Sequence, residues 1–423
     1  MYHSNMNKER HRSMGVDLRL FFRRLKAFLK RKGFKGILEK LKILSQKKDI
    51  LNKYSFIMQE DTFPFDSLAY SRCKPSDTIL LNWVIPEMGE GSGGHTTIFR
   101  FVSNLEKRGF HSRIYLYRSE NYKDSDSVKK FLGDKFPILD KKVEVYYDVK
   151  YISFAHATFA TSWETAYFVK RYENTISKFY FVQDFEPYFF PQGSFYEFAK
   201  KTYSFGLRGI TAGSWLENKL RDEFGMVTDS FSFSYQKDIY KPMKKDDDKK
   251  RIFFYARPVT ARRDFELGLL ALNKVCSVRK DIEVIFAGWD IREYNIPFKY
   301  ENLGIVSAEV LAETYARCDM CLVISNTNLS LVPLEVMGAG SVAICTRGDN
   351  STWLVNDSNA ILVNYDPIEI ADTIEYYFAH MNELEEIREK GMAFAARTSW
   401  SAEADKVADI IRKAIKEDMM KIE

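Results

Sequence analysis

The stretch that decides the fold begins with Thr78-Ile-Leu-Leu-Asn-Trp-Val-Ile85 and continues through Gly89-Glu-Gly-Ser-Gly-Gly-His95 into residues 96–108. The first part is a largely apolar run of strand length, which is typical of a parallel strand buried on both faces. Residues 96–108 carry apolar side chains at the three- and four-residue spacing of a helix. Strand, glycine-rich loop and helix in this order predict the first unit of an α/β domain.

The glycine-rich loop has the composition of a site for phosphate or sugar. Glycines let the backbone approach a ligand closely, and the first turn of the following helix offers free N–H groups. Read literally, Gly89, Gly91 and Gly94 also satisfy the dinucleotide pattern G-x-G-x-x-G, and Glu120 lies beyond the next strand, where a ribose-binding acid would be. Residues 86–88 lengthen the exit from the strand, which the tight dinucleotide turn disfavours. An NAD-dependent oxidoreductase therefore stays as the weaker enzymatic alternative.

Strands and helices continue to alternate along the first half of the chain. The expected strands are 113–117, 151–154, 179–182 and 209–212, and a helix is expected over 164–171. Because the carboxyl ends of parallel strands meet at one edge of a sheet, the loops that follow them are expected to line a ligand site. The polar residues of that edge are His156, Gln183, Asp184 and Glu186.

A charged stretch, residues 241–250, then separates a second series of the same kind. Its expected strands are 252–255, 282–287, 320–324 and 342–345, and its expected helices are 265–276, 309–316 and 334–338. Two α/β halves joined by a linker make the cleft between them the natural ligand site. The predicted organisation is an N-terminal extension over 1–75, Rossmann-like domains over 76–240 and 241–400, and a C-terminal helix over 401–423.

Composition fits a globular protein of two domains. The chain has 423 residues and a net charge of +5, and 45% of its residues are hydrophobic. It contains no run of 18 apolar residues and no secretory signal, so we expect a cytoplasmic protein. Five cysteines, an odd number, favour free thiols, and the pair Cys318 and Cys321 lacks the further ligands of a zinc site.

The N-terminal residues 1–53 differ from the rest because cations surround an apolar helical stripe. Arg23, Arg24, Lys30 and Arg31 flank Phe21, Leu25, Phe28 and Leu29. Such an arm can lie on an anionic membrane surface or pack on its own domain. No nucleic-acid-binding motif accompanies it, so we expect a peripheral association with the inner face of the cell membrane and no nucleic-acid partner.

Two segments of the second half carry a family resemblance. Tyr255-Ala-Arg257-Pro-Val-Thr-Ala-Arg262-Arg263 and Leu322 to Gly340, which contains Pro333-Leu334-Glu335, resemble the GT-B glycosyltransferases of the large retaining family 4. The resemblance implies an α/β protein of the GT-B fold, with two Rossmann-like domains whose parallel sheets face each other across a cleft. The first domain takes the acceptor and the second takes the nucleotide-sugar donor.

The same resemblance implies the donor site. In the family, an arginine and a lysine five residues later clamp the diphosphate, and here Arg257 and Arg262 occupy those places; Arg262 keeps the charge and adds a fork suited to phosphate. Glu335 matches a glutamate that binds the ribose, although a carboxylate that only answers the helix dipole is the simpler alternative. Thr327 stands where the family has a second glutamate that contacts the transferred sugar. This departure suggests an unusual donor, such as a deoxysugar.

A narrower resemblance covers most of residues 76–400. The segment 181–188, Phe-Val-Gln-Asp-Phe-Glu-Pro-Tyr, the upstream segment 160–167, Ala-Thr-Ser-Trp-Glu-Thr-Ala-Tyr, and Pro333-Leu334-Glu335 are similar to the WsaF-like bacterial rhamnosyltransferases. These enzymes act on surface-polysaccharide chains with dTDP-L-rhamnose. The resemblance therefore favours a dTDP-sugar donor and a glycan acceptor, lipid-linked or part of a growing polysaccharide.

The residues expected at the site follow from the motifs and the resemblance together. Arg257, Arg262 and His156 are the candidate catalytic residues. The donor is expected to contact Gly93, Gly94, Arg257, Arg262, Thr327, Pro333, Leu334 and Glu335. The acceptor is expected to contact His95, Gln183, Asp184 and Glu186. His156 can instead be a structural histidine, and Asp184 and Glu186 can be surface acids beside a turn.

We expect transfer from C1 of the donor through an oxocarbenium-like state, with the leaving diphosphate stabilised by cations and with no metal and no further cofactor. The resemblance implies retention of configuration. The replacement of glutamate by Thr327 leaves a second alternative of a different class: a nucleotide-sugar-binding scaffold subunit without activity.

Overall fold

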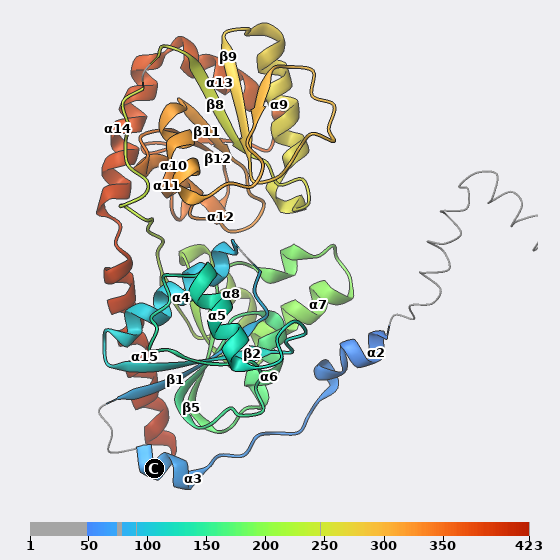
Figure 1. Cartoon of the computed structure of the whole chain (residues 1–423), viewed down its shortest axis with the longest axis vertical. Helices are drawn as coiled ribbons and strands as arrows, with labels where there is room; N and C mark the ends of the chain where they lie inside the picture. The colour runs from blue at the N-terminus through green and yellow to red at the C-terminus, as the bar shows by residue number, and fades with distance from the viewer. Residues whose placement is uncertain (1–48, 74–77, 90, 246, 423) are drawn as a thin grey trace, which may run out of the picture. The chain divides into compact units, whose positions relative to one another are not determined.

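The structure is a computed structural model that describes residues 49–73, 78–89, 91–245 and 247–422 (Figure 1). The chain divides into two units, residues 1–59 and 60–423. Of the first unit the structure describes the short helix α2 (Ile50–Lys53) and the 3-10 turn η1 (Ser55–Met58). The predicted amphipathic stripe and its cations, within residues 1–48, lie outside the described residues.

The first domain is built on a parallel sheet of seven strands in the order β3-β2-β1-β4-β5-β6-β7. The strands are β1 (Ile79–Pro86), β2 (Phe110–Tyr117), β3 (Glu144–Tyr146), β4 (Ala155–Ala160), β5 (Thr175–Val182), β6 (Arg208–Ala212) and β7 (Thr228–Phe231). The helices between them are α4 (Gly93–Glu106), α5 (Ser125–Lys135), α6 (Trp163–Arg171), α7 (Ser194–Lys201) and α8 (Ser214–Phe224). The predicted unit of strand, glycine loop and helix is confirmed as β1 and α4.

The centre of this sheet is buried on both faces, as the apolar run predicted. Trp83 in β1 is fully buried and stacks on Phe159 in β4 with ring centroids 4.1 Å apart. The predicted strand over 151–154 is wrong, because Tyr151 is 63% exposed and Ile152 donates to the carbonyl of Val149 in a turn. The strand runs instead over Ala155–Ala160, where His156 and other polar side chains obscure the apolar pattern.

The second domain has a parallel sheet of six strands in the order β10-β9-β8-β11-β12-β13. The strands are β8 (Lys250–Tyr255), β9 (Ile282–Ala287), β10 (Tyr300–Asn302), β11 (Met320–Val323), β12 (Val342–Thr346) and β13 (Ile361–Val363). The helices are α9 (Phe265–Val278), α10 (Ala308–Arg317), α11 (Val332–Gly338), α12 (Asp349–Thr352), α13 (Pro367–Ala379) and α14 (Met381–Arg397). All four predicted strands are present, and the short strands β10 and β13 were not predicted.

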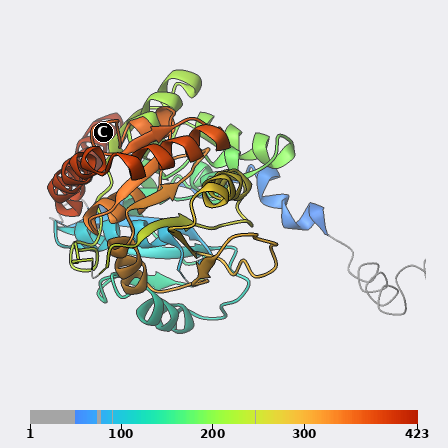
Figure 2. The same ribbon diagram turned by 90° about the horizontal axis from the view of Figure 1, so that it is seen from above.

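After α14 the chain returns to the first domain. The last helix, α15 (Trp400–Ile422), packs on α4 and on strands β5 and β7, and its Asp418 accepts a hydrogen bond from Arg208 in β6 at 3.0 Å. Its red ribbon can be followed in Figure 1 and, from above, in Figure 2. The C-terminal helix therefore completes the first domain, although it follows the second domain in sequence.

The segment between the domains is held by ion pairs. Lys245 Nζ lies 2.9 Å from a carboxylate oxygen of Asp319, and Asp247 pairs with Arg251 at 2.6 Å. All five cysteines are free thiols, as predicted. Within the described residues, no helix combines the length and the apolar character needed to cross a membrane.

Candidate active site

Three arginines gather after β8, at the carboxyl edge of the second sheet. Arg257 and Arg262 follow this strand, and Arg263 adjoins them. Burial lowers the pKa of Arg262 and of Arg263, and the charge of Asp184 opposes that shift. The positive charge of Arg257 lowers both pKa values further. The guanidinium of Arg262 lies 4.1 Å above the ring of Phe189 from the first domain, and its Nε is 3.9 Å from a carboxylate oxygen of Asp184. Such a cluster of guanidinium groups attracts an anion.

The loop after β11 reaches the carboxyl edge of the first sheet. Thr327 Oγ1 donates to Asp184 Oδ2 at 2.8 Å, and the backbone N–H of Asn328 donates to Asp184 Oδ1 at 2.9 Å. The side-chain amide of Asn328 donates to the carbonyls of Gln183 and Ala212 at 2.9 and 2.8 Å. Burial raises the pKa of Asp184, while these donors and the arginines oppose that shift. The loops of the two sheets thus meet at Asp184.

The glycine-rich loop lies at the same edge of the first sheet. The helix α4 begins at Gly93, and the amide of Gln183 donates to the carbonyl of Gly94 at 3.1 Å. His95 Nδ1 and Ser92 Oγ are 2.7 Å apart. Burial lowers the pKa of His95 to about 4, so its imidazole is neutral at pH 7. The structure therefore brings together four of the predicted binding residues, namely Gly93, Gly94, His95 and Gln183.

The residues at the start of α11 are partly withdrawn into the core. The side chains of Pro333 and Leu334 are buried. Glu335 is only partly exposed, and burial raises its pKa to about 7 against the opposing effects of the Tyr240 hydroxyl and the positive charge of Arg100. The ribose contact predicted for Glu335 stays a prediction, as do the donor contacts of its two neighbours.

Comparison with known proteins shows which fold and which domain family this chain resembles. The family model described as "WsaF, C-terminal domain" matches residues 250–375, from the start of β8 into α13. Sucrose-phosphate synthase from Thermosynechococcus elongatus aligns with a TM-score of 0.62 at 13% identity, over 80% of this chain and 100% of that one. Anabaena HepE, solved with UDP and glucose, aligns with a TM-score of 0.62 at 13% identity, over 79% and 100%. The chain has the GT-B fold of these structures, and its second domain matches the WsaF C-terminal domain.

A curated relative extends the match into the first domain of this chain. The O-antigen biosynthesis protein RfbC of Myxococcus xanthus is 29% identical over 335 residues, which are 77% of this chain. The aligned part is 26% of that protein, so the chain spans about a quarter of the length of its relative.

Glu186 lies inside the first domain of the chain. Its carboxylate accepts the N–H of Trp163 at 2.9 Å and the hydroxyl of Tyr180, and 8% of the residue is exposed. Burial raises the pKa of Glu186 to about 7. Because both oxygens have partners within the domain, this position does not favour the predicted contact with an acceptor.

His156 is not at the ligand edge. It is the second residue of β4, and its Nδ1 accepts the N–H of Leu80, near the start of β1, at 2.9 Å. The misplaced strand over 151–154 put this histidine after a strand, whereas it lies near the amino end of one. Burial also lowers its pKa. Its place corresponds to the structural alternative, and we do not include it in the proposed site.

The second domain has an open hollow next to the strand that leads into the arginine cluster. It has a volume of about 750 Å³ and follows the carboxyl ends of β9 and β10, next to β8 in the sheet. Its lining residues are Trp289, Asp290, Arg292, Glu293, Asn302, Leu303, Gly304 and Ile305. In parallel α/β sheets, ligands bind at this edge.

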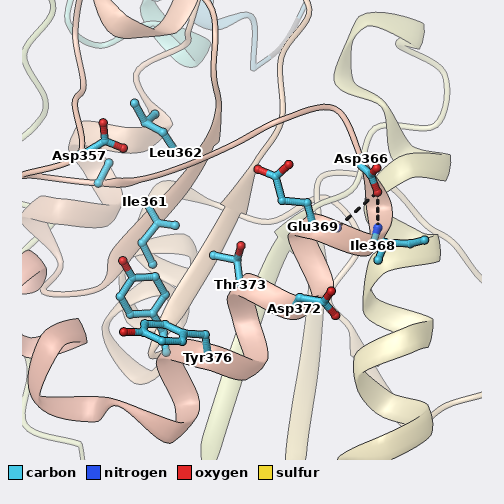
Figure 3. Close-up of a pocket in the computed structure, with 11 residues that line it drawn as sticks. Asp357, Ile361, Leu362, Asp366, Ile368, Glu369, Asp372, Thr373 and Tyr376 are labelled. Carbon is cyan, nitrogen blue, oxygen red and sulfur yellow. Dashed lines mark hydrogen bonds between the residues drawn. The ribbon is translucent and has the colours of Figure 1, made fainter.

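A second hollow, of about 610 Å³, lies beside α13 and is acidic (Figure 3). Asp357, Asp366, Glu369 and Asp372 contribute carboxylates to its lining. Asp366 caps the helix by accepting the N–H of Ile368 at 2.7 Å and that of Glu369 at 3.3 Å, as the dashed lines in Figure 3 show. Such a lining repels a diphosphate, so the arginine cluster is the better anion site.

Two residues of the site carried no assignment from sequence. Arg263 donates to the hydroxyl of Ser325 at 2.6 Å and so fixes the loop after β11 to the arginine cluster. Its place directly after Arg262 was a usable signal. Asn328 offered none, because its partners in the first domain lie more than 100 positions away in the chain. Among the described residues, no group of three His, Cys, Asp or Glu side chains is arranged to hold a metal.

Proposed function

We propose that the protein transfers L-rhamnose from dTDP-L-rhamnose to a growing surface polysaccharide or a lipid-linked glycan, with retention of configuration. The observation that carries the proposal is the arginine cluster at the carboxyl edge of β8, within a WsaF C-terminal domain. This edge is where a parallel sheet binds its ligand, and the cluster has the charge that a sugar diphosphate needs.

The chemistry assigned to the site is glycosyl transfer. The bond between C1 of the sugar and the phosphate oxygen breaks as the acceptor hydroxyl oxygen bonds to C1, and the hydroxyl proton passes to the leaving diphosphate. Negative charge grows on the diphosphate in the transition state, so fixed cations there lower the barrier. Arg257 and Arg262 are proposed to supply this stabilisation, and no protein nucleophile is assigned.

The nucleobase is proposed to enter the hollow beside β9 and β10. Its volume of about 750 Å³ is within the ordinary range for a small-molecule site. It belongs to the same sheet edge as the arginine cluster, so one nucleotide could reach both. Glu335, at the start of α11, is proposed to contact the ribose.

The polysaccharide acceptor is proposed from the relatives. RfbC is named for O-antigen biosynthesis, and the first domain of this chain presents Gln183, His95 and the glycine-rich loop at its ligand edge. The Anabaena protein HepE was solved with UDP and glucose, which supports a nucleotide-sugar donor without naming its base for this chain.

A nucleotide-sugar-binding scaffold is the second candidate. It is favoured by Thr327, whose hydroxyl is already taken up by Asp184 and which supplies no carboxylate to a sugar. A scaffold would bind the nucleoside diphosphate and turn over no donor with any acceptor.

Thermal shift with dTDP, UDP, GDP and NAD tests the proposal, because a ligand that binds only the folded state raises the unfolding temperature. We expect dTDP to give the largest shift and NAD to give none. Release of dTDP from dTDP-L-rhamnose then separates the enzyme from the scaffold. A shift with NAD alone would instead support the oxidoreductase.

A further inference from the structure

Asn328 is a buried polar residue whose hydrogen bonds join the two domains. It lies after β11 in the second domain and is 2% exposed. Its side-chain amide donates to two carbonyls of the first domain, that of Gln183 directly after β5 and that of Ala212 at the end of β6. Its Oδ1 accepts the indole N–H of Trp353 at 2.7 Å. Every polar group of this amide has a partner, so displacing it would leave several buried groups unpaired.

Asp184 completes this contact from the side of the first domain. Its two oxygens accept hydrogen bonds from the hydroxyl of Thr327 and the backbone N–H of Asn328. Oδ1 also accepts the backbone N–H of the next residue, Phe185, at 2.8 Å. Thr327 is fully buried. Two of these three donors therefore belong to the loop of the opposite domain.

A close backbone approach supports the same junction independently. Gly213 follows β6 in the first domain with φ of 89°, a conformation that favours glycine. A Cβ added there would lie 2.5 Å from the ring of Trp353 in the second domain. No larger residue fits without moving Trp353, which is the partner of Asn328.

The second domain holds the loop from its other side. The amide of Asn350 donates to the carbonyls of Ser325 and Thr327 at 2.9 and 2.7 Å, and the hydroxyl of Tyr365 donates to Ser325 at 2.7 Å. The N–H of Asn326 donates to the carbonyl of Arg262 at 3.0 Å. The loop that contacts the first domain is thus tied to the backbone of the proposed diphosphate clamp.

We propose that Asp184, Asn328 and Gly213 form an interdomain bracket that holds the two sheets in one arrangement and places the loop 325–328 and Arg262 for transfer. The proposal deepens and rests on the proposed function, in which Arg262 stabilises the leaving diphosphate. Asp184 is then a positioning residue, and its occupied oxygens replace the acceptor contact expected from sequence.

Distance measurements by double electron–electron resonance on spin-labelled protein test the bracket without any ligand. Labels at Val227→Cys in the first domain and Val278→Cys in the second use side chains that are 60% and 66% exposed, in a Cys73→Ser background that removes the partly exposed thiol. The parent is expected to give one narrow distance distribution. Asp184→Ala, Asn328→Ala and Gly213→Ala are each expected to broaden it about twofold or to add a second population.

A matched control separates the bracket from general destabilisation. Asn359→Ala removes a buried amide of the second domain, 4% exposed, whose Oδ1 accepts the local N–H of Asn356 at 2.9 Å. It should lower the unfolding temperature and leave the distance distribution narrow. Thr327→Val should broaden the distribution, while Thr327→Ser, which keeps the hydroxyl, should restore it.

Turnover supplies the second readout. With dTDP-L-rhamnose as donor, Asp184→Ala should lower kcat about tenfold or more and change dTDP affinity much less, because the nucleotide contacts stay within the second domain. Distance distributions as narrow as the parent's in all three bracket variants would overturn the proposal, whatever the nucleotide assays show. Absence of dTDP binding in the parent would instead overturn the proposed function.

Discussion

The carboxyl edge of the second sheet is closed at one place and open at another. At β8 and β11 the loop 325–328 is fixed by hydrogen bonds to both domains, and Arg262 lies on an aromatic ring of the first domain. At β9 and β10, on the side of β8 away from β11, a hollow of about 750 Å³ is open. Stabilising the charge of a leaving diphosphate requires fixed groups, whereas a planar base can bind in a pocket of matching shape. Under the proposed function, the closed place serves the chemistry and the open place serves recognition of the base.

The largest expected effect is on stability, at the closed place. Asn328→Ala removes the amide donors of two carbonyls, and the Trp353 indole keeps only its longer bond to the carbonyl of Asn350 at 3.1 Å. We therefore expect a loss of about 3 kcal/mol in the free energy of unfolding. Asn302→Ala, beside the hollow, loses an exposed hydrogen bond to Asp290 and one from the N–H of Gly304, and it should cost about 1 kcal/mol. Urea denaturation measures both. Equal costs would remove the contrast between the two places.

The next effect concerns the charge of the closed place. Arg257→Ala and Arg262→Ala are each expected to weaken dTDP binding by about 1.5–3 kcal/mol, the value of a lost charged hydrogen bond. Arg279→Ala is the matched control, because Arg279 pairs with Asp281 just before β9, at the opposite edge of the sheet. Calorimetry should show unchanged affinity in the control. Parent-like affinity in both cluster variants would place the diphosphate elsewhere.

A pH effect tests the interior of the first domain. Burial raises the folded-state pKa of Glu186 from 4.5 to about 7, so the stability linked to its protonated form is full below pH 4.5 and is lost as pH rises through 7. The shift sets an upper limit of about 3 kcal/mol, and we expect about 1–2 kcal/mol. Denaturation at pH 5 and pH 8 should show a larger fall for the parent than for Glu186→Gln. Parallel falls would mean that the carboxyl does not titrate in this window.

The smallest effect is expected at the open place. Ile305 is 79% exposed in the lining of the hollow, so Ile305→Glu should leave the fold intact. Its added negative charge should weaken dTDP binding by about 0.5–1 kcal/mol, and salt should reduce the difference. Titration at low and high salt measures it. Unchanged affinity at low salt would argue that the base does not enter the hollow.

The sequence predicted the sheets better than the contacts between them. Runs such as 282–287 and 342–345 are apolar because both faces of those strands are buried, so periodicity and length were enough. His156 was misassigned because a buried polar pattern in β4 hid the start of the strand. The return of α15 to the first sheet follows from packing that no local pattern records.

The candidate site divides in the same way. Arg257 and Arg262 could be predicted from sequence because they form a compact motif after one strand. Asp184 was identified as polar and near the edge, yet its role depends on Thr327 and Asn328, more than 140 positions away. Gly213 had no signal at all, since its requirement for glycine comes from the ring of Trp353.

Titration of dTDP-L-rhamnose into the parent and the Arg257→Ala Arg262→Ala variant, with dTDP release followed over time, tests the central claim most directly. The claim is that this edge binds a sugar diphosphate and stabilises it as it leaves. The parent is predicted to bind the donor and release dTDP, and the variant is predicted to lose both binding and release. Equal binding and release in the two proteins would contradict the claim.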